Sequence, residues 1–366
     1  MSTKNLHDKP FEDSTLAKLE IFESYLKEWL PVFIQSKYKR IYIIDFFSGP
    51  GYDKSGKEGS PIRILKTVEL FLQQIITKNT KVVIVLNDSN TQKIAELKNN
   101  ISEFKKSRNT YSEFIDIEVE NLDFEEAFQK YYNVISSYPC LILADQNGIK
   151  FISDKYLNAL EKTNKTDFLY FVSSSYVWRF GEINEFKKYL KFDIEKLKEN
   201  PYKFIHRSLI DLIKNQLPIN TTLRLFPFSI KKESNIYGIV FGAKNLLAVE
   251  KFLNLVWKKN PINGEANFDI EDDEFKNQLN FFEDRLTKID KFNILLTELI
   301  KSRGMVTNKE IYIFTLEHGH PPKHAYEHLS MLKKEKLIKY DGKPRINYDS
   351  IYNKKVKVTF KWTNNE

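Results

Sequence analysis

Three acidic residues stand directly after short apolar runs, where their carboxylates can reach a shared ligand. Asp45 ends the first run and opens a glycine loop, Asp88 follows the second run, and Asp145 follows the fourth. Glycine lets the backbone approach a ligand closely, and an acid at a neighbouring strand end can accept hydrogen bonds from ribose hydroxyls. The pattern therefore predicts a site for a nucleoside cofactor.

The loop from Gly49 to Gly59 lacks the G-x-G-x-x-G spacing of the dinucleotide fingerprint, so a simple turn in an α/β core is the alternative to a ligand loop. Asp123, after the third run, either reads an adenine amino group or caps the next helix. Asn87 could take the place of Asp88 at the ribose. The predicted cofactor-binding residues are Asp45, Phe47, Ser48, Gly49, Gly51, Asp88 and Asp123.

The fourth apolar run leads into Asp145-Gln146-Asn147-Gly148. An acid, two amides and a glycine in the crevice of an open α/β sheet could hold an amino or amide group of a substrate, or they could form a tight turn. We predict Asp145 and Asn147 as catalytic residues, with Asp145 orienting the target atom.

Apolar strand-like runs alternate with amphipathic helical patterns over the first two thirds of the chain, which predicts a mostly parallel sheet covered on both faces. Two late runs with a short polar link, Lys231–Asn235, predict an antiparallel hairpin at the sheet edge. Pro31 should bend or end the first helix, and Ser60 should cap the second. The predicted helices include 14–34, 90–106, 124–137 and 153–162, and the predicted strands are 40–45, 81–86, 114–118, 139–144, 168–173, 223–230 and 236–242.

The C-terminal part, 291–366, contains 15 Lys+Arg against 8 Asp+Glu and so holds most of the formal net charge of +8. This excess favours a nucleic-acid partner, DNA or RNA, although a solvated lysine-rich surface would explain it equally. Three short helical patterns and a basic β hairpin predict a winged helix-turn-helix domain. The predicted nucleic-acid-binding residues are Lys323, His324 and Tyr326 in the recognition helix and Lys354, Lys355 and Lys357 in the wing.

The histidine and cysteine residues do not form a recognisable set of metal ligands in the sequence. His324 and His328 would share a helix face, but no acid or cysteine completes a ligand set, and we predict no metal site. The only cysteine, Cys140, lies in an apolar run and should be part of the core, which excludes an internal disulfide and fits a reducing cytoplasm.

The length of 366 residues favours two domains over one. We predict a Rossmann-like domain over 1–264, an acidic helical connector over 265–290 and a basic winged-helix domain over 291–366. No run approaches the ~20 apolar residues of a membrane-spanning helix and the N-terminus lacks an apolar signal region, so we expect a soluble cytoplasmic protein with no membrane association.

Several motifs together resemble the three-Cys-motif partner (TcmP) family over nearly the whole chain. They are Lys18–Trp29, Ile44–Tyr52 followed by Gly59-Ser-Pro61, Tyr237–Ala243 with Trp257 and Gly264-Glu265, and Gln278–Phe282. The resemblance implies a class I methyltransferase-like Rossmann fold, S-adenosylmethionine as cofactor, a C-terminal winged helix, and genes that neighbour a radical-SAM-like three-Cys protein.

The segment after the fourth run departs from the family pattern. Members usually have Asp-Pro-aromatic-Gly there, similar to the motif of amino-methyltransferases, whereas this chain lacks the proline and the aromatic residue. Phe151 and Tyr176 are the two candidates to replace that aromatic residue. We therefore keep two functions open: a methyltransferase-like protein acting on or recognising nucleic acid, and a non-catalytic nucleic-acid- or protein-binding partner with a degenerate methyltransferase fold. A role in bacterial phage defence is compatible with both.

Overall fold

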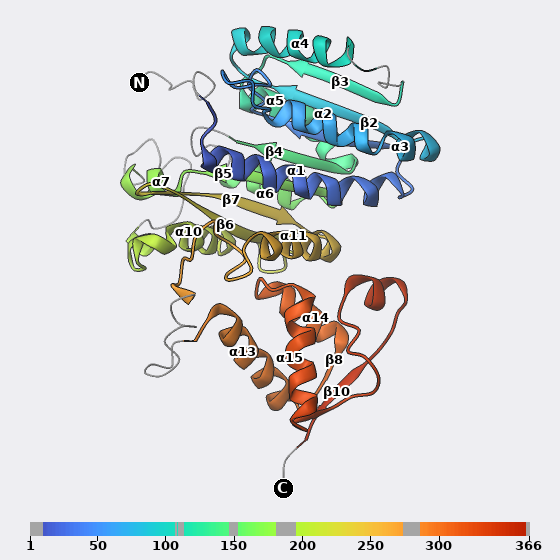
Figure 1. Cartoon of the computed structure of the whole chain (residues 1–366), viewed down its shortest axis with the longest axis vertical. Helices are drawn as coiled ribbons and strands as arrows, with labels where there is room; N and C mark the ends of the chain where they lie inside the picture. Colours follow the sequence, from blue (N-terminus) through green and yellow to red (C-terminus); the bar gives the residue numbers. More distant parts are fainter. Residues whose placement is uncertain are drawn as a thin grey trace. The chain divides into compact units, whose positions relative to one another are not determined.

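The computed structural model describes residues 10–106, 108, 113–145, 153–180, 195–273 and 286–363. The chain divides into two compact units, Met1–Lys244 and Asn245–Glu366, which are described separately below (Figure 1). The division precedes residue 264, where the sequence pattern placed the end of the first domain. Among the described residues, no helix is long and apolar enough to cross a membrane.

The first unit is built on a seven-stranded sheet with the order β3-β2-β1-β4-β5-β7-β6. The first five strands are parallel, and β7 runs antiparallel to both β5 and β6. This order and the reversed β7 are those of the class I methyltransferase-like Rossmann fold, which confirms the predicted fold class. The strands are β1 (Arg40–Asp45), β2 (Lys81–Asn87), β3 (Ile115–Glu120), β4 (Cys140–Ala144), β5 (Thr166–Val172), β6 (Arg224–Lys232) and β7 (Asn235–Ala243).

Helices cover the sheet because alternate strand residues are apolar on both faces. On one face, Ile44, Val85 and Ile142 pack in a buried cluster with side chains from α5, α6, α7 and α10. Helix α1 contacts α2, α3 and β4. The helical elements of this unit are α1 (Asp13–Ile34), α2 (Ser60–Leu70), α3 (Leu72–Lys78), α4 (Thr91–Lys106), α5 (Phe124–Ser137), α6 (Asp154–Glu161), α7 (Ser174–Phe180), α9 (Glu195–Lys198), η3 (Tyr202–Phe204) and α10 (Ile205–Lys214).

Local details differ from the sequence expectation at three places. Helix α1 continues through Pro31 and ends at Ile34. The N-cap of α2 is Gly59, so Ser60 is the first helical residue and makes no capping hydrogen bond. The hairpin strands extend to Lys232 and from Asn235, so the polar link is shorter than predicted.

The second unit contains a winged helix, as predicted. A three-stranded antiparallel sheet, β8-β10-β9, has its first strand between the first and second helices of the motif and its other two strands after the third helix, the order typical of a winged helix. Threonines cap two of its helices: Thr287 and Thr307 each form a capping box with an acid three residues on. Its elements are α11 (Leu246–Lys259), α13 (Lys288–Arg303), β8 (Met305–Thr307), α14 (Asn308–Glu317), α15 (Pro322–Lys334), β9 (Ile338–Lys339), η4 (Asp349–Asn353) and β10 (Thr359–Trp362).

Two predictions for this unit need correction. Residues 265–272, expected to belong to a helical connector, form bends and irregular structure with no helix; residues 274–285 lie outside the described part. The wing is not a plain hairpin, because a short helical turn, η4, lies between β9 and β10. Lys354, Lys355 and Lys357 follow that turn and precede β10.

Candidate functional site

A cavity of about 510 Å³ lies in the first unit at the carboxyl ends of the central strands. In open α/β sheets this edge is where ligands bind, because the strand order changes direction there and leaves a crevice. Helix α1 contributes one wall, and the loops after β1, β2 and β4 contribute the others. The lining residues are Phe11, Thr15, Lys18, Leu19, Phe22, Phe47, Ser48, Gly59, Ser60, Asp88, Ser89, Asn90, Lys93, Leu143, Asp145, Leu169, Tyr170, Phe171 and Ile239.

The glycine loop is tied to the end of β2. The Ser48 backbone N–H and hydroxyl both donate to the Asn87 carbonyl, at 2.8 and 3.0 Å, and the Gly49 N–H donates to Asp88 Oδ2 at 3.1 Å. Gly51 has φ of +96°, a backbone conformation that favours glycine. Its carbonyl accepts from the Gly59 N–H at 2.8 Å, which closes the loop.

Asp45 does not line the cavity; its side chain lies under the glycine loop, in the protein interior, and accepts a hydrogen bond from the start of that loop. Its side chain is fully buried, and Oδ1 accepts from the Phe47 N–H at 3.1 Å. Burial is the main cause that raises the pKa of Asp45 to about 7; hydrogen bonds from Ser60 and the Phe47 backbone oppose the increase, and the charges of Asp145 and Asp88 add to it. Asp45 is therefore a mixture of protonated and ionised forms near neutral pH.

Asp88 lies at the cavity wall, as the sequence pattern predicted. Oδ2 accepts from Gly49 and Oδ1 accepts from the Asn90 N–H at 2.9 Å. A carboxylate offers about four lone-pair positions, so two stay available to a ligand. Asn87, the alternative, is buried and bonded to Phe46 and Leu122, which gives it a structural role.

Asp145 also lines the cavity, and a lysine from α1 reaches it. Lys18 Nζ lies 2.5 Å from Asp145 Oδ2 and 3.8 Å from the centre of the Phe171 ring. The exposed fractions of the Lys18 and Asp145 side chains are 11% and 27%. The acid predicted to hold a target group is thus paired with a cation inside the site.

The structure does not gather all of the predicted residues at the cavity. Phe47, Ser48, Asp88 and Asp145 line it, whereas Asp45, Gly49 and Gly51 shape it from behind. Asp123 is exposed and caps α5, accepting from the Glu126 N–H at 2.9 Å, so the capping alternative holds.

The described part of the cavity lining contains neither of the two candidates for the missing aromatic residue. Asn147 and Phe151 lie outside the described residues. Tyr176 is on α7 and does not line the cavity. Phe171, which sequence reasoning missed, brings an aromatic ring to Lys18 beside Asp145.

Helix α1 is the part of the site that sequence reasoning missed. Thr15, Lys18, Leu19 and Phe22 lie one or two turns apart, and this i, i+3, i+4, i+7 spacing signals a shared helix face. The spacing alone indicates only that this face is covered, because a core face and a cavity wall have the same pattern. The one sequence feature that could have indicated a cavity wall was a charged residue, Lys18, on a face that is otherwise mostly apolar.

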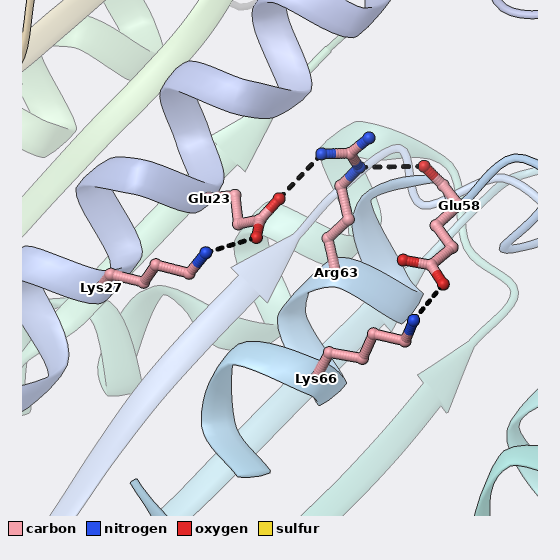
Figure 2. A network of polar contacts seen from close by, with 5 residues as sticks. All are labelled: Glu23, Lys27, Glu58, Arg63 and Lys66. Carbon is pink, nitrogen blue, oxygen red and sulfur yellow. Dashed lines mark hydrogen bonds and ion pairs between the residues drawn. The ribbon is translucent and has the colours of Figure 1, made fainter. Parts of the chain in front are cut away.

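Helix α1 is held in place by polar contacts along its length. Glu23 accepts from Arg63 on α2 at 2.7 Å and from Lys27 at 2.6 Å, and Arg63 also donates to the Glu58 carbonyl (Figure 2). Burial raises the pKa of Glu23, but the hydrogen bonds from Lys27 and Arg63 outweigh it and leave this pKa below its usual value. At the start of the helix, the Phe11 N–H donates to Asp53 at 2.5 Å.

In the second unit, the predicted recognition helix α15 presents only part of the predicted set. Lys323 and Tyr326 are exposed. His324 is half-buried, with its ring 4.4 Å from that of Trp257 and Nδ1 2.9 Å from His320 Nδ1. Burial and the nearby charges of Lys323 and Lys288 lower the pKa of His324 to about 4, so it is uncharged at neutral pH.

The wing lysines are exposed, as a phosphate-binding role requires. Lys354 forms an ion pair with Asp349 at 2.6 Å, and both side chains face solvent. Lys355 and Lys357 are also exposed. Over the described ranges of the chain, no group of three or more His, Cys, Asp or Glu residues could hold a metal ion.

Comparison with known proteins identifies the second unit most clearly. Residues 269–345 match the family model described as GMT-like wHTH domain. This match agrees with the winged helix seen in the order of helices and strands of the second unit. Among curated proteins, none matches the chain.

Solved structures with similar architecture include three of low sequence identity. A Legionella pneumophila protein of the family DUF519 is 11% identical and has a TM-score of 0.36, with 68% of this chain and 92% of that chain covered. The METTL16 methyltransferase domain is 10% identical, with 60% and 66% covered and a TM-score of 0.29. The DszA carbon methyltransferase is 11% identical, with 62% and 55% covered and a TM-score of 0.33. The order and direction of the strands establish the methyltransferase-like fold of the first unit.

Proposed function

We propose that this protein is methyltransferase-like, binds S-adenosylmethionine in the cavity of its first unit, and recognises or acts on nucleic acid through its winged helix. The observation that supports this most directly is the cavity at the carboxyl edge of a sheet with class I methyltransferase order, with Asp88 beside the glycine loop. A cavity of this size is within the usual range of cofactor sites, ~300–1,000 Å³.

Asp88 is the residue that best suits the ribose. Two of its lone-pair positions are used by the backbone of Gly49 and Asn90, and the two others match the two hydroxyls of a ribose. Phe47 and Phe22 supply apolar surface for the rest of a nucleoside. These features support a nucleoside ligand more than a purely apolar one.

Calorimetric titration with S-adenosylmethionine and S-adenosylhomocysteine tests the cofactor. We expect micromolar binding of at least one ligand, and Asp88→Ala should weaken it by about a hundredfold, because hydrogen bonds to a charged group contribute about 1.5–3 kcal/mol each. Asp123→Asn is the matched control, since Asn can still cap α5 and residue 123 does not line the cavity. If folded protein binds neither ligand, the cofactor assignment is wrong.

Methyl transfer itself needs a separate assay. Transfer of a labelled methyl group from the cofactor to DNA or RNA would establish an enzyme. Asp145→Asn should then lower the rate, because Asp145 is the acid at the cavity that could orient a target amine.

A specific observation favours the second candidate, a non-catalytic partner that recognises nucleic acid or protein. Asp145 is already paired with Lys18, and the residues after it lack the proline and aromatic of amino-methyltransferases. Cofactor binding without any methylated product, together with nucleic-acid binding, would support this candidate. The association with a radical-SAM-like three-Cys protein and with phage defence rests on the sequence resemblance alone.

A further inference from the structure

Lys18 is a partly buried cation on the wall of the cavity, at the point where a ligand group would meet Asp145. Its ammonium contacts a carboxylate at 2.5 Å and the face of an aromatic ring at 3.8 Å. An acid and an aromatic face together form a general cation-binding arrangement, which suits ammonium and sulfonium groups alike. The chain therefore fills its own cation subsite.

The position of Lys18 follows from its helix, which several contacts fix in place. The Phe11 N–H is bound by Asp53 before the lysine, and Glu23 is bound by Arg63 after it. Further along, Tyr25 donates to the buried Asp167 at 2.8 Å. Because α1 is anchored on both sides of Lys18, the start of this side chain is fixed at the cavity wall, and its ammonium reaches Asp145 from there.

The charges that line the cavity nearly balance. Asp88 and Asp145 are acidic, Lys18 and Lys93 are basic, and Asp45 lies buried behind the wall. Lys18 thus cancels the carboxylate that would otherwise attract a positively charged ligand group. A second cation in the same space would be repelled by Lys18 or would have to displace it.

We propose that Lys18 is a specificity-determining residue: as the resident cation of the Asp145–Phe171 subsite, it makes the cavity prefer a neutral ligand over the otherwise identical cationic one. This inference rests on the proposed cofactor function. S-adenosylhomocysteine, a neutral thioether, and S-adenosylmethionine, its methylated sulfonium, form such a pair and differ by a methyl group and one charge.

The experiment measures the dissociation constants of both ligands, by calorimetry, for the full-length protein and for Lys18→Met. Methionine keeps the length of the side chain and removes its charge. The wild-type chain should bind the thioether more tightly than the sulfonium, and Lys18→Met should shift the ratio of the two constants by about tenfold towards the sulfonium. Lys18→Arg, which keeps the cation, should retain the wild-type ratio.

Lys27→Met is the matched control, because Lys27 is on the same helix, pairs with Glu23 and does not line the cavity. It should leave the ratio unchanged. If Lys18 only stabilised the fold, or bound a carboxylate common to both ligands, Lys18→Met would weaken both equally and the unchanged ratio would overturn the inference. If neither ligand binds any variant, the proposed cofactor function fails and this inference fails with it.

Discussion

The cavity of the first unit and the wing of the second both depend on charged side chains, but they use them in opposite ways. In the cavity, charges are few and partly buried, and three of the four have fixed partners: Lys18 and Asp145 pair with each other, and Asp88 accepts from the backbone of Gly49 and Asn90. In the wing, Lys354, Lys355 and Lys357 are exposed, and among the described residues only Lys354 pairs with an acid, Asp349, which is itself exposed to solvent.

Because of this difference, the two regions should respond differently to amino-acid substitutions and to salt. Interactions between buried, geometrically fixed charged groups contribute more free energy than those between exposed groups, because water does not screen them. Single substitutions in the cavity should therefore have large effects that are insensitive to salt. Substitutions in the wing should have small effects that add together and fade as salt rises.

The largest effect should come from the glycine loop. Gly51→Val places a β-branched residue at φ of +96°, and its Cβ would lie 3.3 Å from Leu97 Cδ1. We expect ligand affinity to fall by about a hundredfold, because strain of up to about 3 kcal/mol would be relieved by moving the loop. Calorimetry on folded protein measures this.

Gly56→Ala sharpens that test. Gly56 also has positive φ, +79°, but a Cβ there meets nothing within 4 Å. Its effect should be backbone strain alone, with affinity reduced less than about tenfold. Equal losses in both variants would mean that packing against Leu97 does not matter to the site.

The next effect concerns Asp45 and pH. Its pKa of about 7 in the folded chain is above the usual value of 3.8, so the folded state holds a proton that the unfolded state has lost. The free energy of unfolding should then fall as pH rises from about 4 to 7, by up to about 1.4 kcal/mol per pH unit from this group.

Asp45→Asn should remove this part of the slope. Chemical denaturation at several pH values measures it, with Glu96→Gln on the exposed side of α4 as the control. A slope identical to that of the wild-type chain would show that Asp45 is ionised throughout this range, as an exposed carboxylate of the wing would be.

The smallest effect per residue should be in the wing. The combined change of Lys354, Lys355 and Lys357 to Glu should weaken nucleic-acid binding and lower the salt slope of the logarithm of affinity by about 2–3, since each phosphate contact contributes about 0.9. Fluorescence anisotropy over a range of salt concentrations measures both quantities.

The same charge change on α4, at Lys98, Lys105 and Lys106, controls for net charge. If it has the same effect as the wing variant, binding responds to the total charge of the protein and the wing has no special role. If the slope does not change in the wing variant, the wing contacts protein and not phosphate.

Much of the first unit could be predicted from local pattern. The runs that became β1, β2 and β4 are short, apolar and rich in β-branched residues, and the hairpin of β6 and β7 followed from two runs with a short link. Asp88 and Asp145 were predicted at the site because side chains after parallel strands meet at one edge of the sheet.

Local pattern could not separate a helix cap from a ligand contact at Asp123, because both place an acid directly before a helix. It also gave no indication that His324 is half-buried, with its ring against that of Trp257. In each case the decision depends on which way a side chain faces, and that is set by packing against residues distant in sequence.

By itself, the sequence determined the alternation of strands and helices, the glycine loop after β1 and the basic winged helix, because periodicity, turn residues and charge are local properties. Only the tertiary structure decided that α1 forms a wall of the cavity and that Lys18 meets Asp145. Those two residues are 127 positions apart, and no local preference specifies such a contact; it forms because the packing of α1 against the sheet buries the lysine where a carboxylate can pair with it.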